Sequence, residues 1–99
     1  MTKERSNVLE FIKNHSWEIK ENALYKKYIF SSFSLAIKFI NQVAEVSKAN
    51  SHHPKLINSY NSVEVFWITN DVGYITETDV ELAKKCDYLN EMNFLKNEI

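Results

Sequence analysis

Hydrophobic residues recur with two different periods along this chain of 99 residues, and the order of the two periods restricts the fold more than any other feature. Spacings of three and four positions, typical of one face of a helix, occur in residues 6–14, 33–49 and 76–89. Alternating positions or β-favouring aromatic runs, typical of strands, occur in residues 17–20, 24–30, 57–60 and 63–69. The sequence therefore predicts an α+β two-layer sandwich, in which helices cover one face of a four-stranded antiparallel sheet.

Polar residues indicate where the helices begin. Ser6 and Ser32 each precede an apolar stripe and can accept a hydrogen bond from a free amide of the first turn. Thr76 and Asp79 have the spacing of a capping box, in which each side chain bonds the other residue's backbone amide. The side chains expected to be buried are Phe33, Ala36, Ile37, Ile40, Val43 and Ala44 in the middle helix and Leu82, Cys86 and Leu89 in the last.

Turn-forming pairs at 21–22 and 61–62 divide the strands into two hairpins. In the last strand, alternation places Phe66 and Ile68 on the face opposite Val65 and Trp67. Apolar residues on the face without helices predict a covering partner.

The composition is that of one domain, residues 1–99. One glycine and one proline occur, and no repeat, low-complexity tract or composition shift marks a linker. The net charge is −1 with both signs scattered, which excludes sequence-independent binding of nucleic acid or an anionic membrane. The longest apolar run, residues 65–68, is far shorter than the roughly 20 residues that cross a bilayer.

Cysteine usage predicts a reducing location. Cys86 is the only cysteine, so no internal disulfide can form, and its place on a helical apolar stripe predicts a buried, inert thiol. No apolar signal segment follows Lys3 and Arg5. We therefore expect a cytoplasmic protein.

Two adjacent histidines, His52 and His53, stand on a loop that Pro54 stiffens. Imidazole gains or loses a proton near neutral pH, so the pair is a candidate general acid and base. By itself an adjacent pair is more often structural or solvated. A zinc site needs three or four protein ligands, and the remaining histidine, His15, belongs to another helix, so we expect no metal. The capping-box role of Asp79 is likewise the simplest one for that residue.

The spacing of these residues resembles the signature of the pterin-4a-carbinolamine dehydratase family. That signature runs from a charged residue through His-His-Pro, an aromatic residue and Thr-His to an aspartate. The matching residues here are Lys48, His52-His53-Pro54, Tyr60, Thr69-Asn70 and Asp79. The resemblance extends from about Trp17 to Leu89. Three positions depart from it: Asn70 replaces the third family histidine, Leu56 a tryptophan and Tyr74 a glycine.

The resemblance implies a hydro-lyase that needs no cofactor and dehydrates 4a-hydroxytetrahydrobiopterin to quinonoid dihydropterin. It implies that the catalytic positions are those of His52, His53 and Asn70. The substrate-binding positions it implies are Ser51, Pro54, Ile68, Thr69, Asp71 and Asp79. It also implies a homo-oligomer, namely a homotetramer built from dimers whose sheets join edge to edge. The sequence itself leaves a dimer or a tetramer open.

Asn70 keeps an alternative open, because an amide can donate a hydrogen bond but has no titratable proton near neutral pH. The alternative is a catalytically impaired protein that keeps the fold and the oligomer as a binding or regulatory module. The family's transcriptional cofactors suggest such a role.

Overall fold

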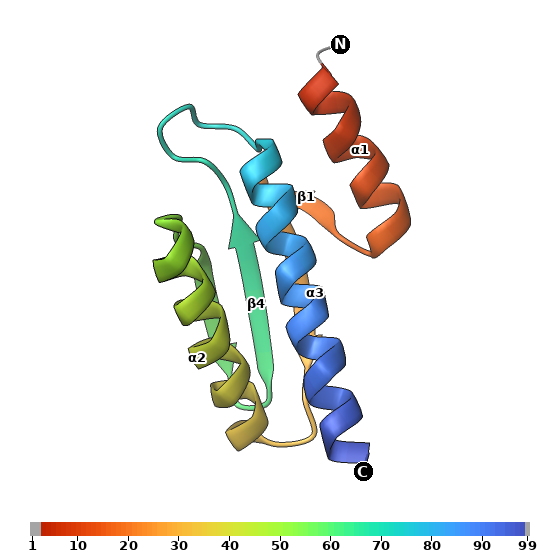
Figure 1. Cartoon of the computed structure of the whole chain (residues 1–99), viewed down its shortest axis with the longest axis vertical. Coiled ribbons are helices and arrows are strands. Elements are labelled where there is room, and N and C mark those ends of the chain that lie inside the picture. The colour runs from red at the N-terminus through yellow and green to blue at the C-terminus, as the bar shows by residue number, and fades with distance from the viewer. Residues whose placement is uncertain (1–2, 99) are drawn as a thin grey trace.

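The computed structural model describes residues 3–98 and has the predicted order of elements (Figure 1). The elements are α1 (Lys3–His15), β1 (Glu18–Lys20), β2 (Ala23–Ile29), α2 (Phe33–Asn50), β3 (Lys55–Ser59), β4 (Ser62–Trp67) and α3 (Glu77–Glu98). The four strands form one antiparallel sheet in the order β1-β2-β4-β3. Helices α2 and α3 lie side by side against β4, and α1 packs on α3. The α+β class predicted from the sequence is therefore confirmed.

Both hairpins form, although one turn is displaced by a residue. Glu21 and Asn22 have φ values of 53° and 65°, the pattern of the type I′ turn that suits the twist of a hairpin. The second turn lies at Tyr60 and Asn61, where Tyr60 has a φ of 51°. The predicted turn at 61–62 was wrong by one residue, because Ser62 is already part of β4, where it pairs with Ile29 of β2.

Ser32 caps α2 as predicted, since its Oγ accepts a hydrogen bond from the Leu35 amide at 3.1 Å. Ser6 is not a cap, because α1 begins at Lys3 and places Ser6 inside the helix. The buried stripe of α2 is also rotated from the predicted one. Its buried residues are Ala36, Phe39, Val43 and Ser47. Phe33, expected to be buried, is 48% exposed, because it starts the helix outside that stripe.

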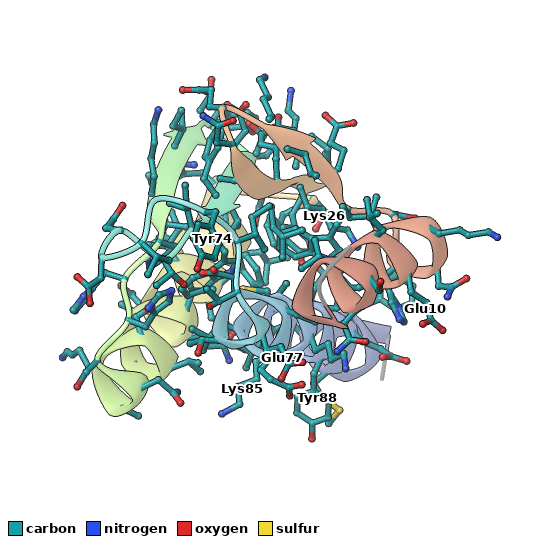
Figure 2. The ribbon with its side chains drawn as sticks, turned by 90° about the horizontal axis from the view of Figure 1, so that it is seen from above. Glu10, Lys26, Tyr74, Glu77, Lys85 and Tyr88 are labelled. Carbon is teal, nitrogen blue, oxygen red and sulfur yellow. The ribbon has the colours of Figure 1, made fainter. Side chains whose placement is uncertain are left out.

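The main core lies between the sheet and the helices. Its sheet residues include Leu24, Tyr28, Val63, Val65 and Trp67, all buried. From α3 it receives Val80, Leu82, Ala83 and Cys86, with Leu89 partly buried against it. Seen from above, Lys85 and Tyr88 point away from the sheet on the outer side of α3 (Figure 2). Among residues 3–98, no helix combines the length and apolarity that crossing a membrane requires.

A cluster of polar contacts centred on Asp87 fixes α3 to the rest of the fold. Asp87 accepts hydrogen bonds from Trp17 Nε1 at 2.9 Å, from Lys26 Nζ at 2.8 Å and from the Tyr28 hydroxyl at 2.5 Å. Trp17 lies between α1 and β1, whereas Lys26 and Tyr28 lie on β2. Asp87 therefore joins two parts of the chain, β2 and the segment before β1, to the helix that also carries Asp79.

On the face of the sheet without helices, part of the apolar surface is shielded within the chain itself. Phe66 and Tyr25 are only 3% and 8% exposed, and together with Ala23 they form a second buried cluster. The cover comes from lysines of the same chain: Lys20 Nζ lies 4.5 Å from the centre of the Tyr25 ring, and Lys55 Nζ lies 4.8 Å from that of Phe66. Long lysine stems shield aromatic surface while their ammonium groups stay hydrated. Phe66 is therefore shielded within its own chain, and Ile68 is half-buried.

Alkaline pH is expected to weaken this face through Tyr25. The hydrogen bond from its hydroxyl to Glu64, 2.7 Å long, together with burial raises the pKa of Tyr25 to about 12. An unfolded tyrosine loses its proton near pH 10. The folded protein thus holds a proton that the unfolded chain releases, so the stabilisation is complete below pH 10 and is lost as the pH rises through 12. Urea unfolding at successive pH values should show a steeper alkaline loss of stability in the unmodified protein than in Tyr25→Phe, and equal slopes would refute this assignment.

Candidate active site

The histidine loop begins where α2 ends. Ser51 adopts the left-handed conformation, with a φ of 49°, and its amide donates to the Lys48 carbonyl. The His52 amide donates to the Ser47 carbonyl at 3.1 Å. These two bonds form the Schellman pattern, which satisfies the free carbonyls at a helix end and turns the chain sharply. The turn directs His52 back toward the sheet and α3.

His52 is held by a buried carboxylate and an aromatic ring. Its Nε2 lies 2.7 Å from Oδ1 of Asp79. The Asp79 side chain is fully buried, whereas that of His52 is 16% exposed. The imidazole also stacks on the Trp67 indole, with ring centres 5.9 Å apart and planes 12° from parallel. Asp79 and Trp67 therefore set the orientation of His52, and a small part of its side chain remains accessible.

The second oxygen of Asp79 joins the end of the sheet to the start of α3. Oδ2 accepts hydrogen bonds from the Thr69 hydroxyl at 2.7 Å and from the Thr76 amide at 2.8 Å. The Thr76 bond is the carboxylate half of the predicted capping box. The other half is absent, because the Thr76 hydroxyl lies 2.7 Å from that of Thr69 instead of bonding the Asp79 amide. Asp79 thus links the histidine loop, the end of β4 and the start of α3.

A tight turn follows Thr69. The carbonyl of Thr69 accepts from the amides of Val72 and Gly73, and its own amide donates to the Tyr74 carbonyl. Gly73 has a φ of 76°, a conformation that residues with a side chain adopt rarely. Asn70 is part of this turn, and its side chain is exposed.

The structure brings together three of the residues predicted for the site, namely His52, Thr69 and Asp79. The remaining predicted residues make no side-chain hydrogen bond to this group in the described part of the chain. Of these, Ser51, His53, Asn70 and Asp71 are exposed, and Pro54 and Ile68 are half-buried. Sequence reasoning did not place Trp67 and Thr76 in the site. The alternation of β4 did put Trp67 on the helix side, where His52 also points.

Cys86 is buried as predicted. Burial raises the pKa of its thiol to about 12, so the sulfur is protonated at neutral pH and is a poor nucleophile. Within residues 3–98, no group of three or more suitable side chains could hold a metal ion.

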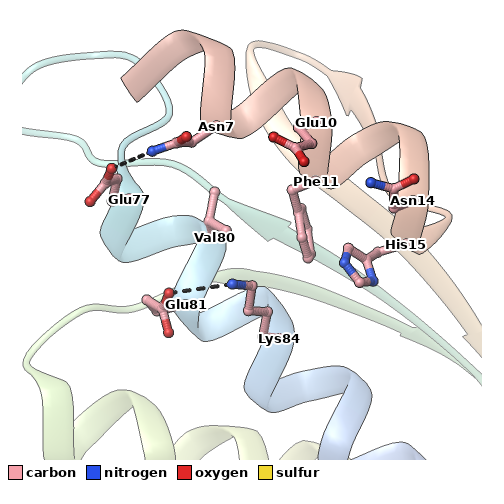
Figure 3. A pocket seen from close by; sticks show the side chains of 9 residues that line it. All are labelled: Asn7, Glu10, Phe11, Asn14, His15, Glu77, Val80, Glu81 and Lys84. Atoms are coloured by element: carbon pink, nitrogen blue, oxygen red, sulfur yellow. Dashed lines mark hydrogen bonds and ion pairs between the residues drawn. The ribbon is translucent and has the colours of Figure 1, made fainter. Parts of the chain in front are cut away.

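A hollow of about 350 Å³ lies between α1 and the start of α3 (Figure 3). Its lining residues are Asn7, Glu10, Phe11, Asn14, His15, Glu77, Val80, Glu81 and Lys84. An Asn7–Glu77 hydrogen bond and a Glu81–Lys84 ion pair engage part of its polar lining. Neither residue of the histidine pair lines this hollow, so it is separate from the candidate site.

Several known proteins are similar to this chain. The family model for pterin 4 alpha carbinolamine dehydratase matches residues 2–89. A protein of Sulfurisphaera tokodaii, provisionally named a pterin-4-alpha-carbinolamine dehydratase, is 41% identical over 80 residues, covering 81% of this chain and 86% of its own. A protein of Jannaschia with the same provisional name is 37% identical over 87 residues, covering 86% and 89%.

Two solved structures resemble the fold. A transcriptional coactivator/pterin dehydratase from Brucella melitensis superimposes with a TM-score of 0.81 at 28% identity, covering 90% of this chain and 96% of the other. A pterin dehydratase-like protein that is a RuBisCO assembly factor in the alpha-carboxysome gives a TM-score of 0.62 at 20% identity, covering 74% and 84%, and shows the fold alone. The family match over most of the chain and the relatives above 30% identity establish that this chain belongs to the pterin-4a-carbinolamine dehydratase family.

Proposed function

We propose that this chain dehydrates 4a-hydroxytetrahydrobiopterin to quinonoid dihydropterin by general acid–base catalysis. The reaction protonates the departing 4a-hydroxyl, which leaves as water, and removes a proton from a ring nitrogen. His52 and His53 carry these two proton transfers, and no cofactor takes part. The pterin lies against the histidine loop and the turn after β4, where Ser51, Ile68 and Asp71 border it.

The observation that carries this proposal is the bridge made by Asp79. One buried carboxylate bonds His52 on the loop and Thr69 at the strand end, so the two segments of the family signature are joined at hydrogen-bond distance. Preorganised groups are effective in catalysis because they need no rearrangement during the reaction. His53, adjacent in sequence and exposed, is free to meet the substrate.

The position of Asn70 tests the proposal. Asn70 is exposed beside Thr69, and its amide can hold a leaving hydroxyl by a hydrogen bond without giving it a proton. A correctly placed acid or base contributes about 10²–10⁴-fold. Rapid-mixing assays should show dehydration by the unmodified protein above the uncatalysed rate, and Asn70→His should raise the rate by up to about 10²-fold, the lower end of that range.

Other results would point elsewhere. An unchanged rate in a folded Asn70→His variant would show that position 70 has no role in proton transfer. If both proteins match the uncatalysed rate, the dehydratase proposal fails and a binding or regulatory module becomes the better one. The observation that favours this second candidate is Asn70 itself, which lacks the titratable proton of the family histidine. Under either function we propose a cytoplasmic homo-oligomer, and under the first a role in tetrahydrobiopterin recycling.

A further inference from the structure

The carboxylate of Asp79 is fully buried and has three contacts of 2.8 Å or less with hydrogen-bonding groups, besides a longer one of 3.4 Å from the Thr76 hydroxyl. His52 Nε2 meets its Oδ1, while the Thr69 hydroxyl and the Thr76 amide meet its Oδ2. An ionised carboxylate only accepts hydrogen bonds. The 2.7 Å contact with His52 therefore requires a proton on Nε2, which in the neutral ring leaves Nδ1 without one.

The other surroundings of His52 agree with this assignment. One face of the ring is stacked on buried Trp67, and Nε2 is directed at buried Asp79. No residue in the part of the chain that the structure describes donates to or accepts from Nδ1. The side chain of His52 is 16% exposed, and Nδ1 is its ring nitrogen without a partner in the described residues.

We infer that Asp79 is a positioning residue that fixes the Nε2-protonated tautomer of His52, so that Nδ1 is the nitrogen that takes the ring proton of the pterin. This rests on the proposed dehydratase function and revises the expectation that Asp79 contacts substrate. Trp67 holds the plane of the imidazole, and Thr69 and Thr76 hold the carboxylate. His53 then supplies the proton to the departing hydroxyl, so the two histidines have opposite roles.

The substitution Asp79→Asn tests the tautomer with little change in shape. The single oxygen of the new amide must serve the Thr69 hydroxyl and the Thr76 amide, so its NH₂ group points at His52. His52 then accepts at Nε2 and carries its proton on Nδ1, the wrong tautomer for a base at that atom. We expect kcat to fall by at least about 10²-fold, the lower end of the contribution of one positioned acid or base.

Nitrogen-15 spectra of the neutral imidazole rings report which ring nitrogen carries the proton. If Asp79 had only a structural role, the Asp79→Asn change would not alter this. His52, identified by the loss of its signals in His52→Gln, should show an unprotonated Nδ1 in the unmodified protein and a protonated Nδ1 in Asp79→Asn. The matched control is Glu81→Gln, an exposed acid-to-amide change on the same helix, which should leave the rate and the tautomer unchanged.

The outcomes separate this inference from the proposed function. A protonated Nδ1 in the unmodified protein, or full activity in Asp79→Asn, overturns the inference even if the protein is an active dehydratase. An inactive unmodified protein defeats the proposed function, while its spectrum still decides the tautomer. If Asp79→Asn does not fold, the spectrum of the unmodified protein still shows which tautomer His52 adopts.

Discussion

Replacing His52 with glutamine is expected to lower the dehydration rate by about 10⁴-fold, the upper end of the worth of one acid–base group. The glutamine amide can still donate a hydrogen bond to buried Asp79, so the carboxylate keeps a partner and the fold is retained. The amide cannot take a proton from the pterin. Single-turnover assays measure the rate, and urea unfolding checks that stability stays close to that of the unmodified protein.

The companion change is His53→Ala, which tests the second histidine of the pair. His53 is exposed and bonds none of the groups around Asp79, so its removal should leave stability unchanged while lowering the rate. If His52→Gln retains most of the activity in a folded protein, proton transfer by His52 is wrong. If His53→Ala does not lower the rate whereas His52→Gln does, His53 is not the residue that protonates the departing hydroxyl.

Replacing Asp87 with alanine is expected to lower the free energy of unfolding by about 3 kcal/mol. The change removes the carboxylate that accepts hydrogen bonds from Trp17, Lys26 and the buried Tyr28 hydroxyl, so these three donors lose their acceptor. Breaking a buried charge pair costs about 3–5 kcal/mol, and the partial exposure of Lys26 and Asp87 reduces that figure. Urea unfolding measures the difference.

Glu91→Ala is the matched control for Asp87, because Glu91 is an exposed acid one turn further along α3. It should change the unfolding free energy by no more than about 0.5 kcal/mol. A loss below about 1 kcal/mol in Asp87→Ala would show that water replaces Asp87 at little cost. The cluster would then contribute nothing to the placement of α3.

Local patterns were sufficient to predict the elements and their order. Alternation in β4 separated Val65 and Trp67 from Phe66, and the Glu21–Asn22 turn followed from the residues that tolerate positive φ. Ser32 was identifiable as a cap because its bond spans three residues. These features depend on neighbours in the chain, which a sequence displays directly.

Features that depend on the angle at which elements pack could not be predicted in the same way. The buried stripe of α2 includes Phe39 and Ser47, and its direction is set by the sheet and α3 rather than by α2. Shielding of Phe66 likewise involves Lys55, which pairs with it from the neighbouring strand and places Nζ over its ring. Side-chain directions of this kind follow from strand pairing and helix contacts.

The sequence by itself determined the α+β class, the hairpins and the histidine pair with its family spacing. Only the tertiary structure decided which groups meet: His52 and Asp79 are 27 residues apart, and Thr69 and Asp79 are 10 apart. From the spacing alone, a helix cap is a sufficient role for Asp79. It becomes the partner of an imidazole because the end of α2, the end of β4 and the start of α3 converge at one point, where a buried carboxylate must satisfy every donor around it.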